Sequence, residues 1–159
     1  MKDAVLKELT EILRETFEGG LPGQGTQYLD HNSGIYPTMD RLTAEQASFS
    51  WQGIPSIASH IRHMHFHLQV VVEWMDGKRH KRDWLASFQP YTVTPEEWQQ
   101  LKTDFEATRQ VFLQRMQQLS EAEIAEDMGH GTVAHLAYHL GAVRQLMHLV
   151  DGGLRPAEG

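Results

Sequence analysis

The stretch TVAHLAYHLGAVRQLMHLV, residues 132–150, shows the pattern that decides the fold. Its apolar residues recur every three or four positions, which is the spacing that places side chains on one face of an α-helix. These positions are Val133, Leu136, Leu140, Val143, Met147 and Val150. The stretch is therefore predicted to be an amphipathic helix of about five turns that buries one face in a core.

Three other stretches have the same spacing of apolar residues and predict further long helices. They are residues 2–18, 55–75 and 94–119. Pro55 is expected in the first turn of its helix, where a missing N–H costs nothing. Thr94, Pro95 and Glu97 form a helix start, with a cap, a first-turn proline and an acid that closes the capping box. The sequence therefore predicts four long helices.

The connections between the long helices contain signals for short ones. A short helix is expected over residues 35–42, and capping-box patterns at Thr43 and Ser120 each open another. The residues Gly129-His130-Gly131 are expected to break the chain before the last helix. No segment alternates in the way of a β-strand. The prediction is an all-α fold, a four-helix bundle with short extra helices in its connections.

Length and charge narrow the class of protein. A chain of 159 residues that is 40% hydrophobic is long enough for one domain with a real core. That domain is predicted over residues 1–150, with a loose C-terminal tail over 151–159. The net charge of −7 argues against nucleic acid or an anionic membrane as the partner. The sequence has no secretory signal and no apolar run of membrane-spanning length, so a cytoplasmic protein is expected.

Two residue counts depart from the ordinary. The chain has no cysteine, which excludes disulfides, cysteine-bound zinc and a protein thiol nucleophile together. It has ten histidines, more than twice the usual share of about 2%. Because imidazole is the commonest metal ligand, the histidines are the first candidates for a functional site.

The spacing of the histidines favours a site between two helices. His135 and His139 are one helical turn apart, about 40° around the axis, so both can bind one metal ion from one helix. A third ligand must then come from another helix. His60, His63 and His67 lie within about 60° of one another at the edge of an apolar face. In a bundle, either His60 or His63 could meet the pair.

Other interpretations of these histidines stay open on spacing alone. A histidine at the edge of a core is often a structural residue, and a cluster of them can also control a pH-sensitive assembly. His65 points away from the shared face of its helix and is expected to be solvated. Metal site, core or interface histidines, and pH-responsive dimer are therefore three hypotheses.

Three motifs in this order resemble the DinB/YfiT-like metalloenzyme superfamily. The segment SIASHIRHM, residues 56–64, resembles the second helix of that family, in which a Ser or Thr precedes a ligand histidine by seven residues. The segment HLAYHLGA, residues 135–142, resembles its last-helix motif, although Leu140 and Ala142 stand where many members have Arg and Gln. The segment LTAEQAS, residues 42–48, resembles the stretch before the second helix. The resemblance extends over roughly residues 2–150.

The resemblance implies a fold and a ligand set. Members of the family are up-down-down-up four-helix bundles, often homodimers, and bind a divalent metal, commonly zinc or nickel, through three histidines. Carried over by position, the metal ligands are His63, His135 and His139. His60 stands where the family more often has an apolar residue, and it is expected to support a ligand or to replace one. His67, one turn beyond His63, is a weaker alternative ligand.

The resemblance also implies a reaction. Family members with known activity include transferases and isomerases that use low-molecular-weight thiols such as bacillithiol or mycothiol, with a small-molecule substrate. A metal with three protein ligands and one open position suits this chemistry, because it activates a bound thiol or water. No residue is assigned as a general base. The alternative is a non-catalytic metal-binding or stress-associated bundle.

Overall fold

The computed structural model describes residues 1–151, apart from the side chain of Asp127. Within these residues the chain forms helices and one isolated bridge between Gly20 and His31, and no β-strand. The all-α prediction is confirmed. The tail that was predicted over residues 151–159 lies, except for Asp151, outside the described residues.

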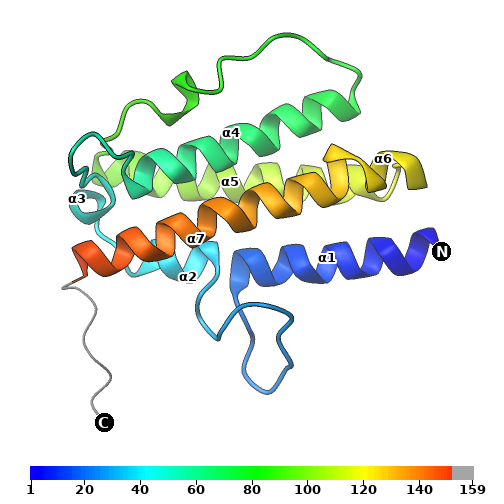
Figure 1. Ribbon diagram of the computed structural model, residues 1–159, viewed down its shortest axis with the longest axis horizontal. Coiled ribbons are helices and arrows are strands. Elements are labelled where there is room, and N and C mark those ends of the chain that lie inside the picture. The colour runs from blue at the N-terminus through cyan, green and yellow to red at the C-terminus, as the bar shows by residue number, and fades with distance from the viewer. Residues whose placement is uncertain (152–159) are drawn as a thin grey trace.

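Four long helices lie side by side as a bundle (Figure 1). They are α1 (Lys2–Glu18), α4 (Ile57–Met75), α5 (Pro95–Met116) and α7 (Thr132–Val150). The colours of Figure 1 show that α1 and α7 run in one direction and that α4 and α5 run in the other. Helix α4 packs against both α5 and α7, and α7 packs against α1. The apolar faces meet in one core, whose fully buried side chains include Phe17, Ile61, Met64, Phe105, Phe112, Leu136 and Val143.

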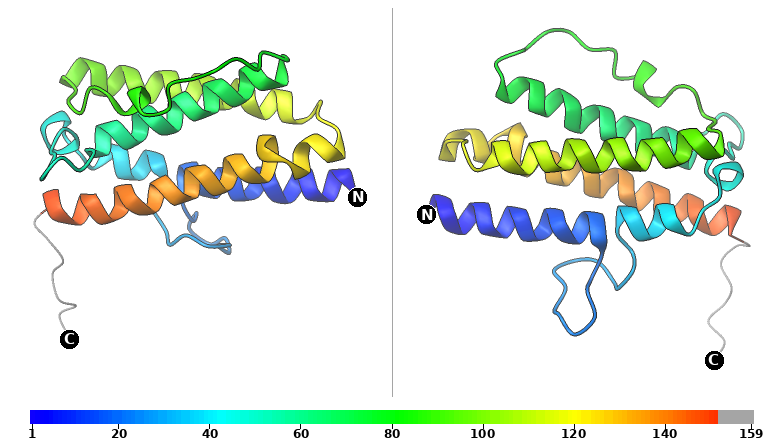
Figure 2. Two further views of the ribbon diagram at one scale, coloured as in Figure 1. Left: turned by 45° about the horizontal axis from the view of Figure 1, so that its top comes forward. Right: turned by 180° about the vertical axis from the view of Figure 1, so that it is seen from behind.

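Short helices occupy the connections. The sequence predicts three of them, α2 (Ile35–Asp40), α3 (Ala44–Ala47) and α6 (Glu121–Ala125), but not the 3₁₀ turn η1 (Ala86–Phe88) or the π turn η2 (Asp127–Gly131). The capping boxes at Thr43, Thr94 and Ser120 are all formed. The loop after α1 and the connection after α4 lie on opposite sides of the bundle (Figure 2).

Two helix ends differ from the prediction. Helix α4 begins at Ile57, so Pro55 precedes the helix instead of lying in its first turn. Ser56 is the cap, because its hydroxyl accepts the N–H of Ser59 and donates to the carbonyl of Tyr91. At the other end of the next long helix, α5 stops at Met116, one turn earlier than the apolar spacing predicts.

The predicted break at residues 129–131 is wrong. These residues form a turn of π-helix that runs directly into α7. Gly129 lies so close to α6 that a Cβ atom there would stand 2.2 Å from the carbonyl oxygen of Ile124. The glycine therefore permits a close approach of two helical turns and does not end the helix.

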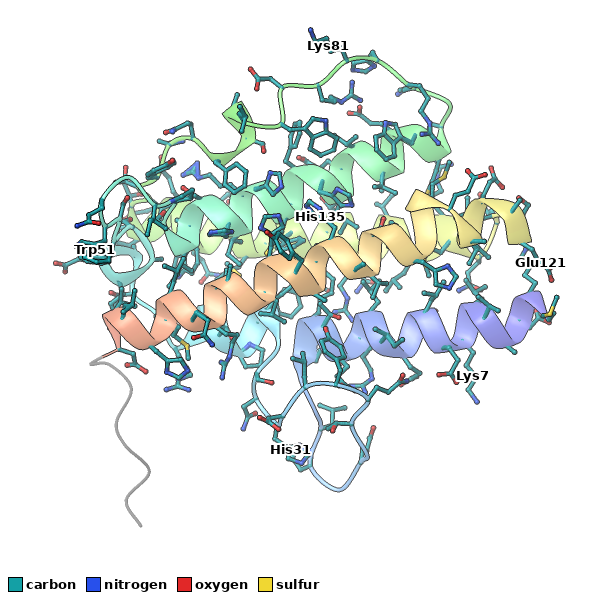
Figure 3. The ribbon with its side chains drawn as sticks, in the orientation of Figure 1. Lys7, His31, Trp51, Lys81, Glu121 and His135 are labelled. Carbon is teal, nitrogen blue, oxygen red and sulfur yellow. The ribbon has the colours of Figure 1, made fainter. Side chains whose placement is uncertain are left out.

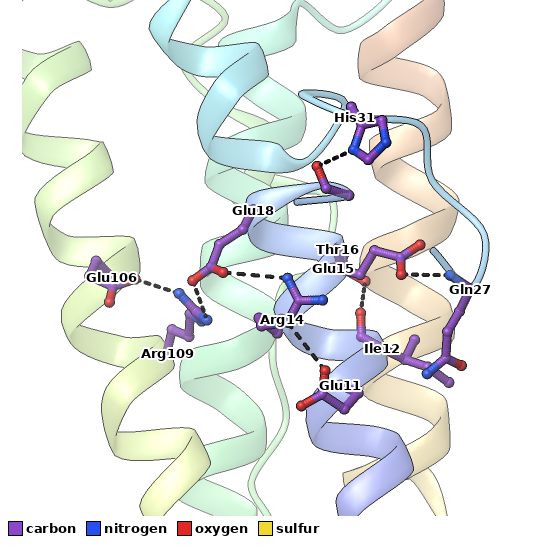
Figure 4. Close-up of polar contacts among 11 residues, drawn as sticks. Glu11, Ile12, Arg14, Glu15, Thr16, Glu18, Gln27, His31, Glu106 and Arg109 are labelled. Carbon is purple, nitrogen blue, oxygen red and sulfur yellow. Dashed lines mark hydrogen bonds and ion pairs between the residues drawn. The ribbon is translucent and has the colours of Figure 1, made fainter. Parts of the chain in front are cut away.

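A polar cluster on α1 fixes the loop that follows this helix (Figure 4). The carboxylate of Glu15, only 1% exposed, accepts the backbone N–H groups of three consecutive loop residues, Gln27, Tyr28 and Leu29. Arg109 of α5 forms ion pairs with Glu18 of α1 and with Glu106 on its own helix. We call these residues the α1 cluster. They connect three segments that are distant in the sequence.

Candidate metal centre

Five histidine rings form a row between α4 and α7. His60, His63 and His67 come from α4, and His135 and His139 come from α7. Neighbouring rings alternate between the two helices, in the order His60, His139, His63, His135, His67. The distances between successive ring centroids are 5.3, 4.5, 5.0 and 3.9 Å. His135, between His63 and His67 in this histidine row, is labelled in Figure 3.

The row brings together the three residues that the sequence comparison with the DinB/YfiT-like family selects as ligands. One ring nitrogen from each of His63, His135 and His139 lies within 4.8 Å of the others, so the three could hold a metal ion. His63 is 5% exposed and His139 is 7% exposed. The cluster forms because the histidine-bearing faces of α4 and α7 point toward each other in the bundle.

Hydrogen bonds decide which nitrogen of His63 is free. The hydroxyl of Ser87 donates its only proton to the carbonyl of Trp84 and lies 2.7 Å from His63 Nδ1. The Nδ1 atom of His63 must therefore donate to the Ser87 oxygen, which leaves an unprotonated Nε2. Histidines that bind metals are usually oriented by such a bond from the other ring nitrogen.

The two histidines of α7 also present nitrogens to the cluster. His139 Nδ1 is 3.0 Å from His60 Nδ1, and in the tautomer in which His139 Nδ1 donates to His60, His139 Nε2 is unprotonated and can bind a ligand. His135 Nε2 is buried and has no hydrogen-bond partner. Because buried polar atoms are nearly always paired, this orphan nitrogen fits a group that binds a metal ion.

The protonation states suit metal binding. Burial, together with the charge of the neighbouring histidines, lowers the pKa of His63 to about 4 and that of His139 to about 3. Burial also lowers the pKa of His135. At neutral pH these imidazoles are uncharged, and an uncharged imidazole is the form that binds a metal.

The connection after α4 covers one side of the row. The ring of Phe88 stacks on His63, with centroids 4.0 Å apart and planes at 11°. The ring of Trp84 contacts both His63 and His67. We call Trp84, Ser87 and Phe88 the roof. The aromatic residues in this connection are visible in the sequence, but Ser87 gives no signal, because nothing in the spacing shows where a turn of 3₁₀-helix will lie.

The histidines of α4 that are not proposed as ligands lie in two different places. His60 lies in the row beside His139 and His67 lies beside His135, as described above. His65 does not lie in solvent as expected, because its Nε2 bonds to the hydroxyl of Thr108 and its ring packs on Phe105 of α5. His65 points away from α7, but on that side α4 packs against α5 and not against solvent.

No carboxylate belongs to the cluster among the described side chains. Glu73 of α4 forms an ion pair with Arg82. Tyr138, between the two histidines of α7, is 77% exposed and touches His139 only with the edge of its ring. The cluster therefore consists of imidazoles alone, and its residues supply no charge to balance a cation.

Comparison with known proteins identifies the relatives of this chain. A sequence model described as the DinB superfamily matches residues 27–149, well over half of the chain, and this range includes every histidine of the row. The same kind of search finds no match among curated proteins or among solved structures. Within residues 1–151, no helix has both the length and the apolar character needed to cross a membrane.

Proposed function

The chain belongs to the DinB superfamily, and from this premise we propose that it is a divalent-metal-dependent enzyme. His63, His135 and His139 are the proposed ligands, and zinc or nickel is the proposed metal. The observation that supports this assignment most strongly is the buried His135 Nε2, which has no partner in a cluster of uncharged imidazoles. A divalent ion would satisfy this atom and use the lone pairs that burial keeps unprotonated.

The ligand set suits a catalytic site better than a structural one. Three protein ligands leave one coordination position open, and three neutral imidazoles leave the positive charge of the ion undiminished. When bound, such an ion lowers the pKa of a thiol or water that takes the open position. The chain itself has no cysteine, so a sulfur nucleophile must come from a cosubstrate.

We propose that the reaction is an S-transfer from a low-molecular-weight thiol to a small electrophile. The sulfur forms a bond to an electrophilic carbon, the leaving group departs with the electrons of the broken bond, and the thiol proton passes to solvent. Phe88 and Trp84 shield the ligands from water on one side, and Ser87 holds His63 in the tautomer that binds. These residues orient a ligand or exclude water, and none of them takes part in making or breaking a bond.

We also propose a homodimer in the cytoplasm. The support for a dimer is the outer face of α7, where Tyr138 is 77% exposed and Leu149 is 60% exposed. Large apolar side chains in solvent are typical of surfaces that bind another chain. Light scattering of the wild type and of Tyr138→Glu tests this: the variant should be monomeric if α7 forms the interface, and an unchanged mass contradicts that placement.

The test of the reaction compares two histidine variants of the same helix. Tag-free protein loaded with zinc or nickel is assayed with a panel of low-molecular-weight thiols, including bacillithiol and mycothiol, and a chromogenic aryl halide. The wild type and His65→Ala should transfer the thiol, whereas His63→Ala should lose turnover by about 100-fold or more, because it removes a ligand. Metal binding without turnover for any thiol contradicts the transferase and supports the non-catalytic alternative.

A further inference from the structure

One residue of the histidine row has no role in the three-ligand set. His67 is 8% exposed, and its Nε2 is buried without a hydrogen-bond partner. An unsatisfied buried polar atom costs about 1–3 kcal/mol, so a nitrogen in this position calls for an explanation. Phenylalanine has nearly the same shape and would avoid that cost.

His67 lies close to two of the proposed ligands, His63 and His135. It lies one helical turn from His63, on the same buried face of α4, which is the spacing at which two histidines bind one ion. It also stacks face to face on His135, with centroids 3.9 Å apart and ring planes only 15° apart. The orphan Nε2 atoms of these two residues therefore belong to adjacent, nearly parallel rings.

The stacking excludes simultaneous binding of one ion by both rings. An imidazole binds a metal through a lone pair that lies in the plane of the ring, at about 2.0–2.1 Å from the nitrogen. An ion in the plane of His135 is well outside the plane of His67 when the rings are nearly parallel and their centroids are 3.9 Å apart. The two residues can only alternate.

We propose that His67 is an alternative third ligand, which binds the same ion together with His63 and His139 when His135 leaves its place. The inference rests on the proposed metal site. The second ligand combination is His63, His67 and His139. Its two ligands one helical turn apart come from α4, whereas in the first combination they come from α7. The site then retains its ion while one imidazole is released.

The contact between the two rings makes the exchange available. The space that His67 would enter is occupied by the ring of His135, against which it already packs. Loss of that ring opens the space without any change in the helices.

The experiment measures zinc affinity by competition with a chromogenic chelator, and zinc content by elemental analysis, in tag-free protein. His135→Ala vacates the space of the ring and should still bind one zinc ion per chain, about 10- to 100-fold more weakly than the wild type, because His67 must change rotamer. His67→Phe/His135→Ala differs from it only in lacking the spare imidazole and should bind no zinc.

Two further variants complete the comparison. His135→Phe fills the space with a ring that cannot bind, so it should lose zinc as the double variant does. His67→Phe alone should bind zinc about as tightly as the wild type, because the first ligand set is intact. If His135→Ala does not fold, as judged by circular dichroism, His135→Ser vacates the same space and replaces it in both backgrounds.

The outcomes separate this inference from the proposed function. Zinc bound by the wild type but lost equally from His135→Ala and from the double variant overturns the spare ligand and leaves the three-histidine site standing. Equal binding by His135→Ala and the double variant also overturns it, because His67 then contributes nothing. A folded wild type that binds no zinc contradicts the metal site itself.

Discussion

The carboxylate of Glu15 in the α1 cluster and the histidine row are both buried and polar, but they differ in how their atoms are satisfied. In the α1 cluster, both carboxylate oxygens of Glu15 accept backbone N–H groups, and Figure 4 shows the one from Gln27. In the histidine row, His67 Nε2 and His135 Nε2 have no partner. A buried carboxylate with satisfied oxygens stabilises the fold by itself, whereas unpaired buried imidazole nitrogens indicate a ligand that the chain alone does not supply.

The charges of the two clusters differ in the same way. Burial alone would raise the pKa of Glu15, but the N–H groups of Gln27, Tyr28 and Leu29 outweigh it and the pKa is lowered, so the group stays ionised. In the histidine row, burial and the neighbouring histidines lower the pKa of His63 and His139, and the backbone of Trp84, which raises that of His63, does not outweigh them. One cluster maintains a charge, and the other maintains neutral lone pairs.

The largest expected effect is the loss of the Glu15 carboxylate. Glu15→Ala leaves three backbone N–H groups without their acceptor and should lower the free energy of unfolding by about 3 kcal/mol. For a chain of this size that corresponds to a fall in Tm of about 6–12 °C in differential scanning calorimetry. Glu11→Ala, on the same helix with its side chain 49% exposed, should change Tm by about 1–2 °C at most. Equal shifts for the two variants would show that the Glu15 contacts do not stabilise the loop.

Added zinc should stabilise the protein through the histidine row and not through the α1 cluster. At a free zinc concentration 100 times the Kd, binding should stabilise the wild type by about 2.7 kcal/mol. Glu15→Ala should keep this increase in Tm although its starting Tm is lower, and His139→Ala should lose it. An equal increase in Tm on addition of zinc for His139→Ala and the wild type would contradict the assignment of zinc binding to the histidine row.

The pH dependence of the metal-free protein should separate the clusters into two ranges. The folded pKa values of His63, about 4, and His139, about 3, lie below the ordinary value of 6.5, so the unfolded chain binds protons that the folded chain does not. Stability contributed by these groups is complete above pH 6.5 and is lost as the pH falls towards 4, by up to about 1.4 kcal/mol per pH unit for each group. The lowered pKa of Glu15 contributes only below its ordinary value of 4.5.

Urea titrations across this range check the assignment. His139→Phe should reduce the slope of stability against pH between pH 6.5 and 4.5, because one group no longer takes up a proton on unfolding. Glu15→Gln should leave the slope in this range unchanged, although the protein is less stable throughout. A slope that responds to Glu15→Gln and not to His139→Phe would reverse the assignment.

The smallest expected effects concern the residues that orient the ligands. Ser87→Ala removes the acceptor for His63 Nδ1, and His60→Phe removes the partner of His139 Nδ1. Each should weaken zinc binding by about 10-fold without a change in stoichiometry. Ser50→Ala is the matched control, because its hydroxyl bonds only to the carbonyl of Ile54 in the loop before α4. An unchanged affinity for Ser87→Ala would show that the roof does not orient His63.

The helices and the facing histidines were predictable because they depend on periodicity. A spacing of four residues places His135 beside His139 whatever the rest of the chain does, and the resemblance at residues 56–64 adds His63. The stacking of His67 on His135 was not predictable, because it depends on how far one helix slides along the other. The roof and the Glu15 contacts were missed for a related reason: both involve connections, whose paths show no period.

The central claim is that His63, His135 and His139 of the histidine row bind one divalent ion. The most direct test is the metal content of tag-free wild-type protein, purified from metal-replete medium and measured by elemental analysis together with a zinc titration of the metal-free form. We predict about one zinc or nickel ion per chain, and saturation at one equivalent. A folded protein that carries no divalent metal and takes up none at micromolar zinc would contradict the account.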